Sequence, residues 1–145
     1  MSAVVFVDSN VLIYAYDVDA GAKRELAEAR LRELWTSQGG RLSVQVLQEF
    51  YVNATQKLAS PVARSTAREI VKAYGVWIHR ATSAETVIRA AEICEFARIS
   101  FWDSLIVASA EEAEADEILS EDFNDGQLIA GIKVVNPFRT SVMEP

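Results

Sequence analysis

Histidine and cysteine are almost absent from this chain of 145 residues, which contains one of each. A single cysteine, Cys94, excludes an intrachain disulfide and a cysteine-rich zinc site, and it fits a reducing compartment. A single histidine, His79, excludes any mechanism that needs two histidines. No Gly-x-Ser-x-Gly elbow accompanies it, so the sequence offers no serine-hydrolase triad of that type. Catalytic chemistry in this chain must therefore rest on other residue types.

Long apolar runs are also lacking, since none approaches the roughly 20 residues that a membrane helix requires. The N-terminus has no basic region before its first acid, Asp8, which argues against a signal peptide. We therefore predict a cytoplasmic protein that does not enter a membrane. Half of the residues are hydrophobic and 24% are charged, which is typical of a globular protein, and we predict a single domain over residues 1–145.

Positive charge is scarce, because 14 lysines and arginines face 21 aspartates and glutamates for a formal net charge of −7. Proteins that bind nucleic acids usually present a basic surface. Carboxylates that hold a divalent cation would reconcile the two, since the ion reverses the local charge. A path for a nucleic-acid strand remains available on local basic residues, namely Lys23, Arg24, Arg64, Arg68, Lys72 and Arg80. An acidic exterior suits a basic partner protein equally well.

Apolar patterns along the chain alternate between strand-like and helix-like segments. Strands are predicted at residues 3–7, 41–44, 74–79, 117–120 and 132–135. Helices are predicted at residues 10–17, 22–35 and 45–58, from Ser60-Pro61 to about residue 73, from Thr82 or Ser83 to about residue 98, and at residues 102–115. This alternation predicts an α/β fold in three layers, with a short central parallel sheet and helices on both faces.

Acidic residues stand at the positions where such a fold places its chemistry. Asp8 follows the first predicted strand, and Asp122 and Asp125 follow the strand predicted at residues 117–120. Glu49 lies within a largely apolar helix, where a charge needs a reason, and Asp103 opens another apolar helix. Because ligands bind beyond the carboxyl ends of parallel strands, we expect four of these acids to converge on one pocket: Asp8, Glu49, Asp103 and Asp122.

Clustered carboxylates are the ligands that Mg²⁺ and Mn²⁺ prefer. Like charges in a poorly solvated site raise one another's pKa values unless a cation compensates them. A divalent ion supplies that compensation and also polarises a phosphoryl oxygen and activates water. Each acid has a structural interpretation as well, since Asp8 and Asp103 suit helix N-termini, whereas Asp122 and Asp125 suit a turn.

Four segments, in this order, resemble the motifs of the PIN-domain family, particularly the VapC-type toxins of bacterial toxin–antitoxin pairs. They are residues 5–14, with Asp8-Ser9-Asn10 after a strand; residues 43–50, with an acid on a helix; residues 100–106; and residues 120–126. The resemblance spans residues 3 to about 137. The ordered set is more specific for the fold than for the substrate.

This resemblance implies a PIN-like fold and a ribonuclease that uses Mg²⁺ or Mn²⁺. It implies a catalytic set in which three acids also bind the metal: Asp8, Asp103 and Asp122 as ligands, with Glu49 as the further catalytic acid. It implies supporting roles for Asn10, Ser120 and Asp125, and leaves open whether Asp122 or Asp125 is the fourth acid. RNA as substrate, a cognate antitoxin and a second copy of the chain are the implied partners.

Two alternatives stand beside the nuclease. The first alternative is an inactive PIN-like module that acts through protein contacts, although such a module usually lacks one of the acids. The second is a phosphatase-type hydrolase with Asp8 as nucleophile, although that chemistry needs a second acid at the position of Asn10.

Overall fold

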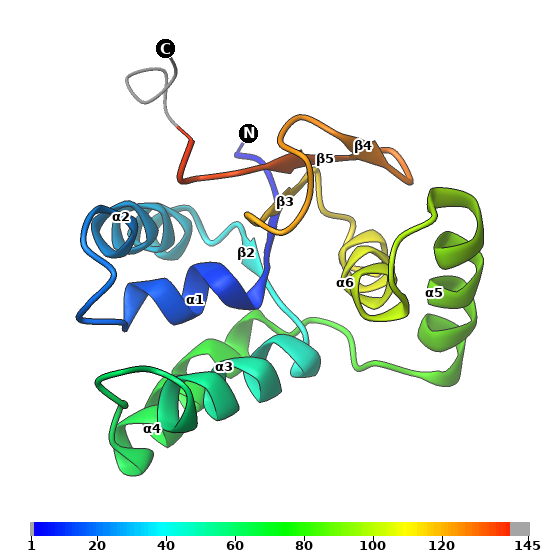
Figure 1. The fold of residues 1–145 in the computed structure, drawn as a ribbon. Helices are drawn as coiled ribbons and strands as arrows, with labels where there is room; N and C mark the ends of the chain where they lie inside the picture. The colour runs from blue at the N-terminus through cyan, green and yellow to red at the C-terminus, as the bar shows by residue number, and fades with distance from the viewer. Residues whose placement is uncertain (1, 140–145) are drawn as a thin grey trace.

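A computed structural model describes residues 2–139, so the outermost parts of the predicted domain, residue 1 and residues 140–145, lie outside the described residues. A five-stranded sheet in the order β2-β1-β3-β5-β4 runs through the centre of the molecule (Figure 1). The parallel strands pair β1 with β2 and β3, and β3 with β5, whereas β4 pairs antiparallel with β5. Their bounds are β1 (Val5–Val7), β2 (Gly40–Arg41), β3 (Glu117–Leu119), β4 (Leu128–Ile129) and β5 (Ile132–Val135).

Helices cover both faces of the sheet, which confirms the predicted α/β arrangement (Figure 1). Helices α1 and α2 lie on one side and α5 and α6 on the other, while α3 and α4 lie beyond the end of β1. Their bounds are α1 (Ser9–Ala15), α2 (Ala22–Ser37), α3 (Val44–Gln56), α4 (Arg64–Tyr74), α5 (Ala84–Ala97) and α6 (Phe101–Glu112). Among residues 2–139, no helix has the length and apolar character needed to cross a lipid bilayer.

Strands β1 and β3 lie in the hydrophobic core. All three residues of β1 are buried, as are Ile118 and Leu119 of β3. Their β-branched and aliphatic side chains suit a strand that is covered on both faces. The chain becomes polar where these strands end, at Asp8 and Ser120, where β1 passes into α1 and β3 passes into a loop. The fold therefore places the first and last motifs side by side.

The strand predicted at residues 74–79 is wrong. The chain forms a short 3₁₀ helix, η1 (Gly75–Trp77), which is tied to the end of β2 by a backbone hydrogen bond from Leu42 N to Trp77 O at 3.2 Å. The apolar pattern has another cause. The indole of Trp77 lies directly on Gly40 of β2, where an added Cβ would come within 2.7 Å of the ring. Burial of an aromatic side chain, rather than strand pairing, explains the pattern.

Two smaller differences concern element boundaries. Helix α4 begins at Arg64 and not at Ser60-Pro61, because the Ser60 hydroxyl donates to the Asp19 carboxylate at 2.9 Å instead of capping a helix. The turn expected before the last strand contains β4, which forms a short hairpin with β5. Neither difference moves the acids of interest.

Candidate active site

Asp8 is the buried centre of the site. It follows β1, its N–H donates to Leu119 O of β3 at 3.0 Å, and its residue is only 3% exposed. One carboxylate oxygen accepts from Ser9 N at 2.8 Å, so Asp8 does cap α1. The other oxygen accepts from the Ser120 hydroxyl at 2.7 Å. The helix-cap and active-site interpretations of Asp8 therefore describe the two oxygens of one side chain.

Burial raises the pKa of Asp8 from 3.8 to about 7. The hydrogen bonds from Ser120 and Ser9 lower this pKa, while the nearby negative charges of Asp122 and Glu49 raise it. The donors that surround this carboxyl group are neutral, so they stabilise its charge only in part. A cation bound nearby would therefore lower the pKa of Asp8 and favour its charged form.

Asp122 is joined to Asp8 through two polar side chains. The Asn10 amide donates to Asp122 Oδ2 and to Ser120 Oγ, both at 3.1 Å, and to Asp8 Oδ2 at a longer 3.4 Å. Asp122 N donates to Ser120 Oγ at 3.1 Å, and Ser120 is fully buried. Asn10 and Ser120 therefore hold the carboxylates of the first and last motifs at a fixed separation.

Glu49 and Asp103 approach from helices α3 and α6. Both residues are half-buried. Ser100 caps α6 by accepting from Asp103 N at 3.0 Å, which fixes the first turn that carries this acid. Burial raises the pKa of Asp103, a bond with Ser100 lowers it, and the charge of Asp122 raises it. Since Glu49 similarly raises the pKa of Asp8, the four acids lie within electrostatic reach of one another as a chain of neighbours.

The donor set suits a hard divalent cation, because it consists of carboxylate oxygens with amide and hydroxyl support. Among residues 2–139, however, no three acidic, histidine or cysteine side chains are gathered tightly enough to enclose an ion as they stand. The fold thus brings the acids to one region without closing them to ligand distance.

Asp125 has a different setting from the other acids. It is exposed, and its Oδ1 accepts from Asn136 N at 2.8 Å, which ties the loop after β3 to the end of β5. Among residues 2–139, Asp125 shares no hydrogen-bond partner with the other acids. This geometry gives Asp125 a role in holding the loop and makes Asp122 the better candidate for the fourth acid.

A cluster of four side chains beside the site, called the brace below, was not predicted from the sequence; it consists of Tyr14, Lys23, Glu121 and Phe138. Glu121 accepts from Tyr14 OH at 2.6 Å and from Lys23 Nζ at 2.9 Å, and the ammonium lies 4.8 Å from the centroid of the Tyr14 ring and 5.5 Å from that of Phe138. Glu121 N also donates to Asn10 Oδ1 at 3.3 Å. The brace therefore supports the loop that carries Asp122. Its signal in the sequence is weak, since these residues come from separate segments.

Comparison with known proteins places this geometry in a family. The family model described as the PIN domain matches residues 5–125. No curated protein sequence matches the chain at a significant level. Solved structures share the fold, at sequence identities too low to show more.

One similar structure is FitAcB from Neisseria gonorrhoeae, with a TM-score of 0.69, 18% identity, and coverage of 94% of this chain and 99% of that chain. A toxin–antitoxin complex from Klebsiella pneumoniae has a TM-score of 0.67 and 19% identity, and the match covers 94% of this chain and 99% of that chain. VapC20 from Mycobacterium tuberculosis, described as a sarcin–ricin loop cleaving toxin, has a TM-score of 0.60 and 17% identity, and the match covers 81% of this chain and 89% of that chain. Because the family model spans most of the chain and the fold agrees, this protein belongs to the PIN-domain family.

Proposed function

We propose that this protein is a metal-dependent endoribonuclease and the toxin of a toxin–antitoxin pair. The observation that carries the proposal is the burial of Asp8 beside two further acids, which raises its pKa to about 7. A structural helix cap does not need such surroundings, since an exposed Asp or Asn caps equally well. Perturbed carboxyl groups of this kind are typical of functional sites.

The proposed mechanism assigns Asp8, Asp103 and Asp122 as ligands of Mg²⁺ or Mn²⁺. Such an ion, when bound, supplies charge that stabilises the developing phosphoryl transition state and lowers the pKa of water. Glu49 then accepts a proton from the attacking water, as a positioned general base. Asn10 and Ser120 orient two of these ligands, Asp8 and Asp122. Asn10 stands where a phosphatase would need a second acid, and its amide donates to Asp122, which speaks against that alternative.

RNA as the substrate draws support from the family and from the basic residues of α4. Arg64, Arg68 and Lys72 are all exposed, and their four-residue spacing places them on one side of the helix. They offer a path for a phosphate backbone along α4, which packs against α3, the helix that carries Glu49. VapC20, the sarcin–ricin loop cleaving toxin, is a protein of the same fold with an activity of this type.

Protein partners are the second part of the proposal. An apolar groove of about 440 Å³ lies between α3 and α4, lined by Val44, Leu47, Tyr51, Val52 and Val71 together with two polar residues. Val44 and Val52 are more than 40% exposed. We propose that the chain forms a homodimer through its apolar helices and binds an antitoxin whose basic residue reaches the carboxylates. A clean monomer at micromolar concentration in light scattering would count against the homodimer.

The decisive experiment is cleavage of mixed RNA by protein that has been stripped with a chelator and then supplied with Mg²⁺ or Mn²⁺. Asp8→Asn should lower cleavage by roughly two orders of magnitude or more, within the range for loss of a catalytic electrostatic group. The matched control is Asp116→Asn. Asp116 lies before β3, at the opposite end of the central strands, and accepts from Val4 N at 2.8 Å. Near-normal cleavage by Asp8→Asn, or full cleavage in excess chelator, would refute the proposal.

A further inference from the structure

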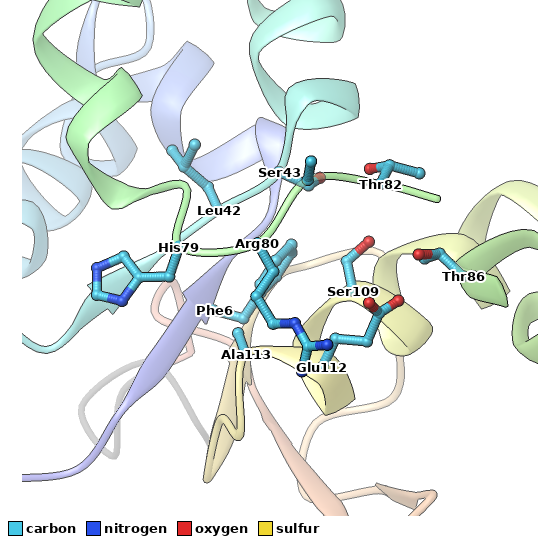
Figure 2. A pocket seen from close by; sticks show the side chains of 11 residues that line it. Phe6, Leu42, Ser43, His79, Arg80, Thr82, Thr86, Ser109, Glu112 and Ala113 are labelled. Carbon is cyan, nitrogen blue, oxygen red and sulfur yellow. The ribbon is translucent and has the colours of Figure 1, made fainter. Parts of the chain in front are cut away.

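A second polar pocket, partly open at the exposed residues Arg80, Ala81 and Thr82, lies between β2, α6 and the segment that precedes α5 (Figure 2). Its walls include Phe6 and Leu42 on the apolar side and Ser43, Ser109 and Glu112 on the polar side. The interior leaves about 10 Å³ for the centre of a water-sized molecule. The cavity is thus small, partly polar and separate from the four acids of the candidate active site.

Unpartnered polar atoms are concentrated on this cavity. Within residues 2–139, four buried side-chain oxygens have no hydrogen-bond partner in the protein. Three of them belong to residues that line the cavity: Ser43 Oγ, Ser109 Oγ and Glu112 Oε1. Buried polar groups in folded proteins are almost always satisfied, so their convergence on one small space points to a shared partner.

The position of Ser43 in the fold makes its unpartnered hydroxyl more unusual. It occupies the N-cap position of α3 with an extended backbone, the position from which serine ordinarily accepts a hydrogen bond from its own helix. Its side chain makes no such cap bond, although the residue is only 3% exposed. The hydroxyl therefore gives up a local partner without gaining solvent, which is reasonable only if another group in the cavity bonds to it.

We propose that Ser43, Ser109 and Glu112 bind one ordered water molecule that bridges the start of α3 to the last turns of α6. The free space corresponds to about one water, and buried waters typically make about three hydrogen bonds. Water can donate to the Glu112 carboxylate and exchange a further bond with each hydroxyl. A divalent cation fits less well, because the cavity presents one carboxylate where such ions prefer several.

The bridge would link the two helices that carry Glu49 and Asp103. A direct polar contact between the starts of these helices is the bond from Gln45 Nε2 to Trp102 O, at 3.3 Å. A water held further along α6 adds a second point of attachment. It thereby restricts how the helices move relative to each other. This consequence rests on the proposed function, whereas the water site itself does not.

The first test is a crystal structure of the wild-type protein at a resolution that shows ordered water. We expect one peak about 2.7–3.2 Å from the oxygens of Ser43, Ser109 and Glu112. The peak should persist when sodium and potassium salts are replaced by a bulky organic cation. Loss of the peak in that exchange would identify a metal ion and overturn the proposal. An empty cavity, with the hydroxyls bonded to protein groups, would overturn it as well.

The second test is a double-mutant cycle on stability. Ser43→Ala and Ser109→Ala should each raise the unfolded-to-folded ratio about five- to thirty-fold, the size of a lost buried hydrogen bond. In the double variant, the rise in the unfolded-to-folded ratio should be smaller than the product of the two single rises, because a single water serves both hydroxyls. Multiplicative losses would contradict the bridge. If a variant does not fold, the wild-type crystal structure decides alone.

The matched control pairs Ser43→Ala with Ser104→Ala. Ser104 is buried on the same helix as Ser109, but its hydroxyl donates to Ser100 O at 2.8 Å and does not line the cavity. In this control cycle, the effects of the two substitutions on the unfolded-to-folded ratio should multiply. Cleavage activity plays no part in either test, so failure of the water bridge leaves the nuclease proposal standing, and failure of the nuclease leaves the bridge standing.

Discussion

The candidate site has two halves that are built in different ways: a strand-end half, with Asp8 and Asp122, and a helix half, with Glu49 and Asp103. Asp8 and Asp122 are joined through Ser120 and Asn10 by hydrogen bonds of 2.7 and 3.1 Å. Glu49 and Asp103 come from α3 and α6, and within the described residues neither forms a hydrogen bond with the strand-end acids. Their link to the strand-end acids is electrostatic, since the charge of Glu49 raises the pKa of Asp8 and the charge of Asp122 raises the pKa of Asp103.

This difference indicates a division of labour. The sheet, whose strands are locked by ladder bonds, presents one half of the site ready-made. Helix packing supplies the other half, and its position depends on contacts far from the acids. An ion that binds to the strand-end half would draw the helix half toward it. Variants in the two halves should therefore separate activity from stability.

The largest effect expected from the helix half is on activity alone. Asp103→Asn should lower RNA cleavage about 100-fold, because it removes a proposed metal ligand. The free energy of unfolding should change by less than about 0.5 kcal/mol, since the half-buried side chain supports no other element. Cleavage assays and urea denaturation on one preparation measure both quantities. Strong destabilisation would show that the helix half is as interlocked as the strand-end half.

The pH dependence of stability tests the strand-end half. The pKa of Asp8 is raised to about 7 in the folded protein, so folding favours the protonated form. Its contribution to stability is complete below the ordinary pKa near 4 and is lost as the pH rises toward 7. The loss should be about 4 kcal/mol in the ion-free protein, by linkage from the two pKa values.

Asp8→Asn isolates this contribution, because the variant lacks the titrating group. The difference in unfolding free energy between the two proteins, measured by urea denaturation from pH 4 to pH 8, should grow in favour of the variant. Saturating Mg²⁺ should reverse the trend in the wild type. Parallel curves would mean that burial does not perturb Asp8 as described.

Two serines allow a matched comparison of the halves. Ser120→Ala removes the donor to the buried Asp8 carboxylate and should lower the unfolding free energy by about 1–3 kcal/mol at neutral pH. Ser100→Ala removes the cap of α6 and should cost about 1 kcal/mol. Thermal and urea denaturation measure both. Equal losses would weaken the distinction between the halves.

The smallest effect is expected at the brace. Lys23 has a side chain that is 44% exposed, so its ion pair with Glu121 should contribute less than about 1 kcal/mol. Lys23→Met should lower cleavage by less than about tenfold, because it loosens the Asp122 loop without removing a ligand. Arg24→Met is the control, since Arg24 pairs with Glu28 within α2. A loss as large as that of Asp8→Asn would assign Lys23 a direct contact with the substrate.

Much of the fold was predictable because its main elements have strong local patterns. The buried strand before Asp8, the helices of both layers and the acid at the start of α6 all follow from apolar periodicity and capping residues. Ser83 illustrates this, since it caps α5 in a capping box with Thr86, as one of the two predicted positions. Local chemistry is enough to predict these elements without knowledge of tertiary contacts.

The failures have a common cause in contacts that the sequence does not display. Residues 74–79 carry a strand-like pattern, but their aromatic side chains are buried against one another, with Tyr74 and Trp77 ring centroids 4.8 Å apart. The β4–β5 hairpin was missed because it turns at Ala130 and Gly131, both with positive φ, and alanine gives no turn signal. The Glu121 brace joins separate segments in the same way.

The seating of Trp77 on Gly40 also bears on self-association. A strand at the edge of a sheet exposes unpaired backbone groups on which a second molecule can build. At β2, an edge strand, the chain at Trp77 lies beside the end of the strand, with Leu42 N donating to Trp77 O at 3.2 Å, and the indole packs on Gly40 where a side chain would stand. A methyl group at position 40 would displace the ring and disturb this contact. Gly40→Ala should therefore expose more of this edge and raise the tendency of the protein to self-associate.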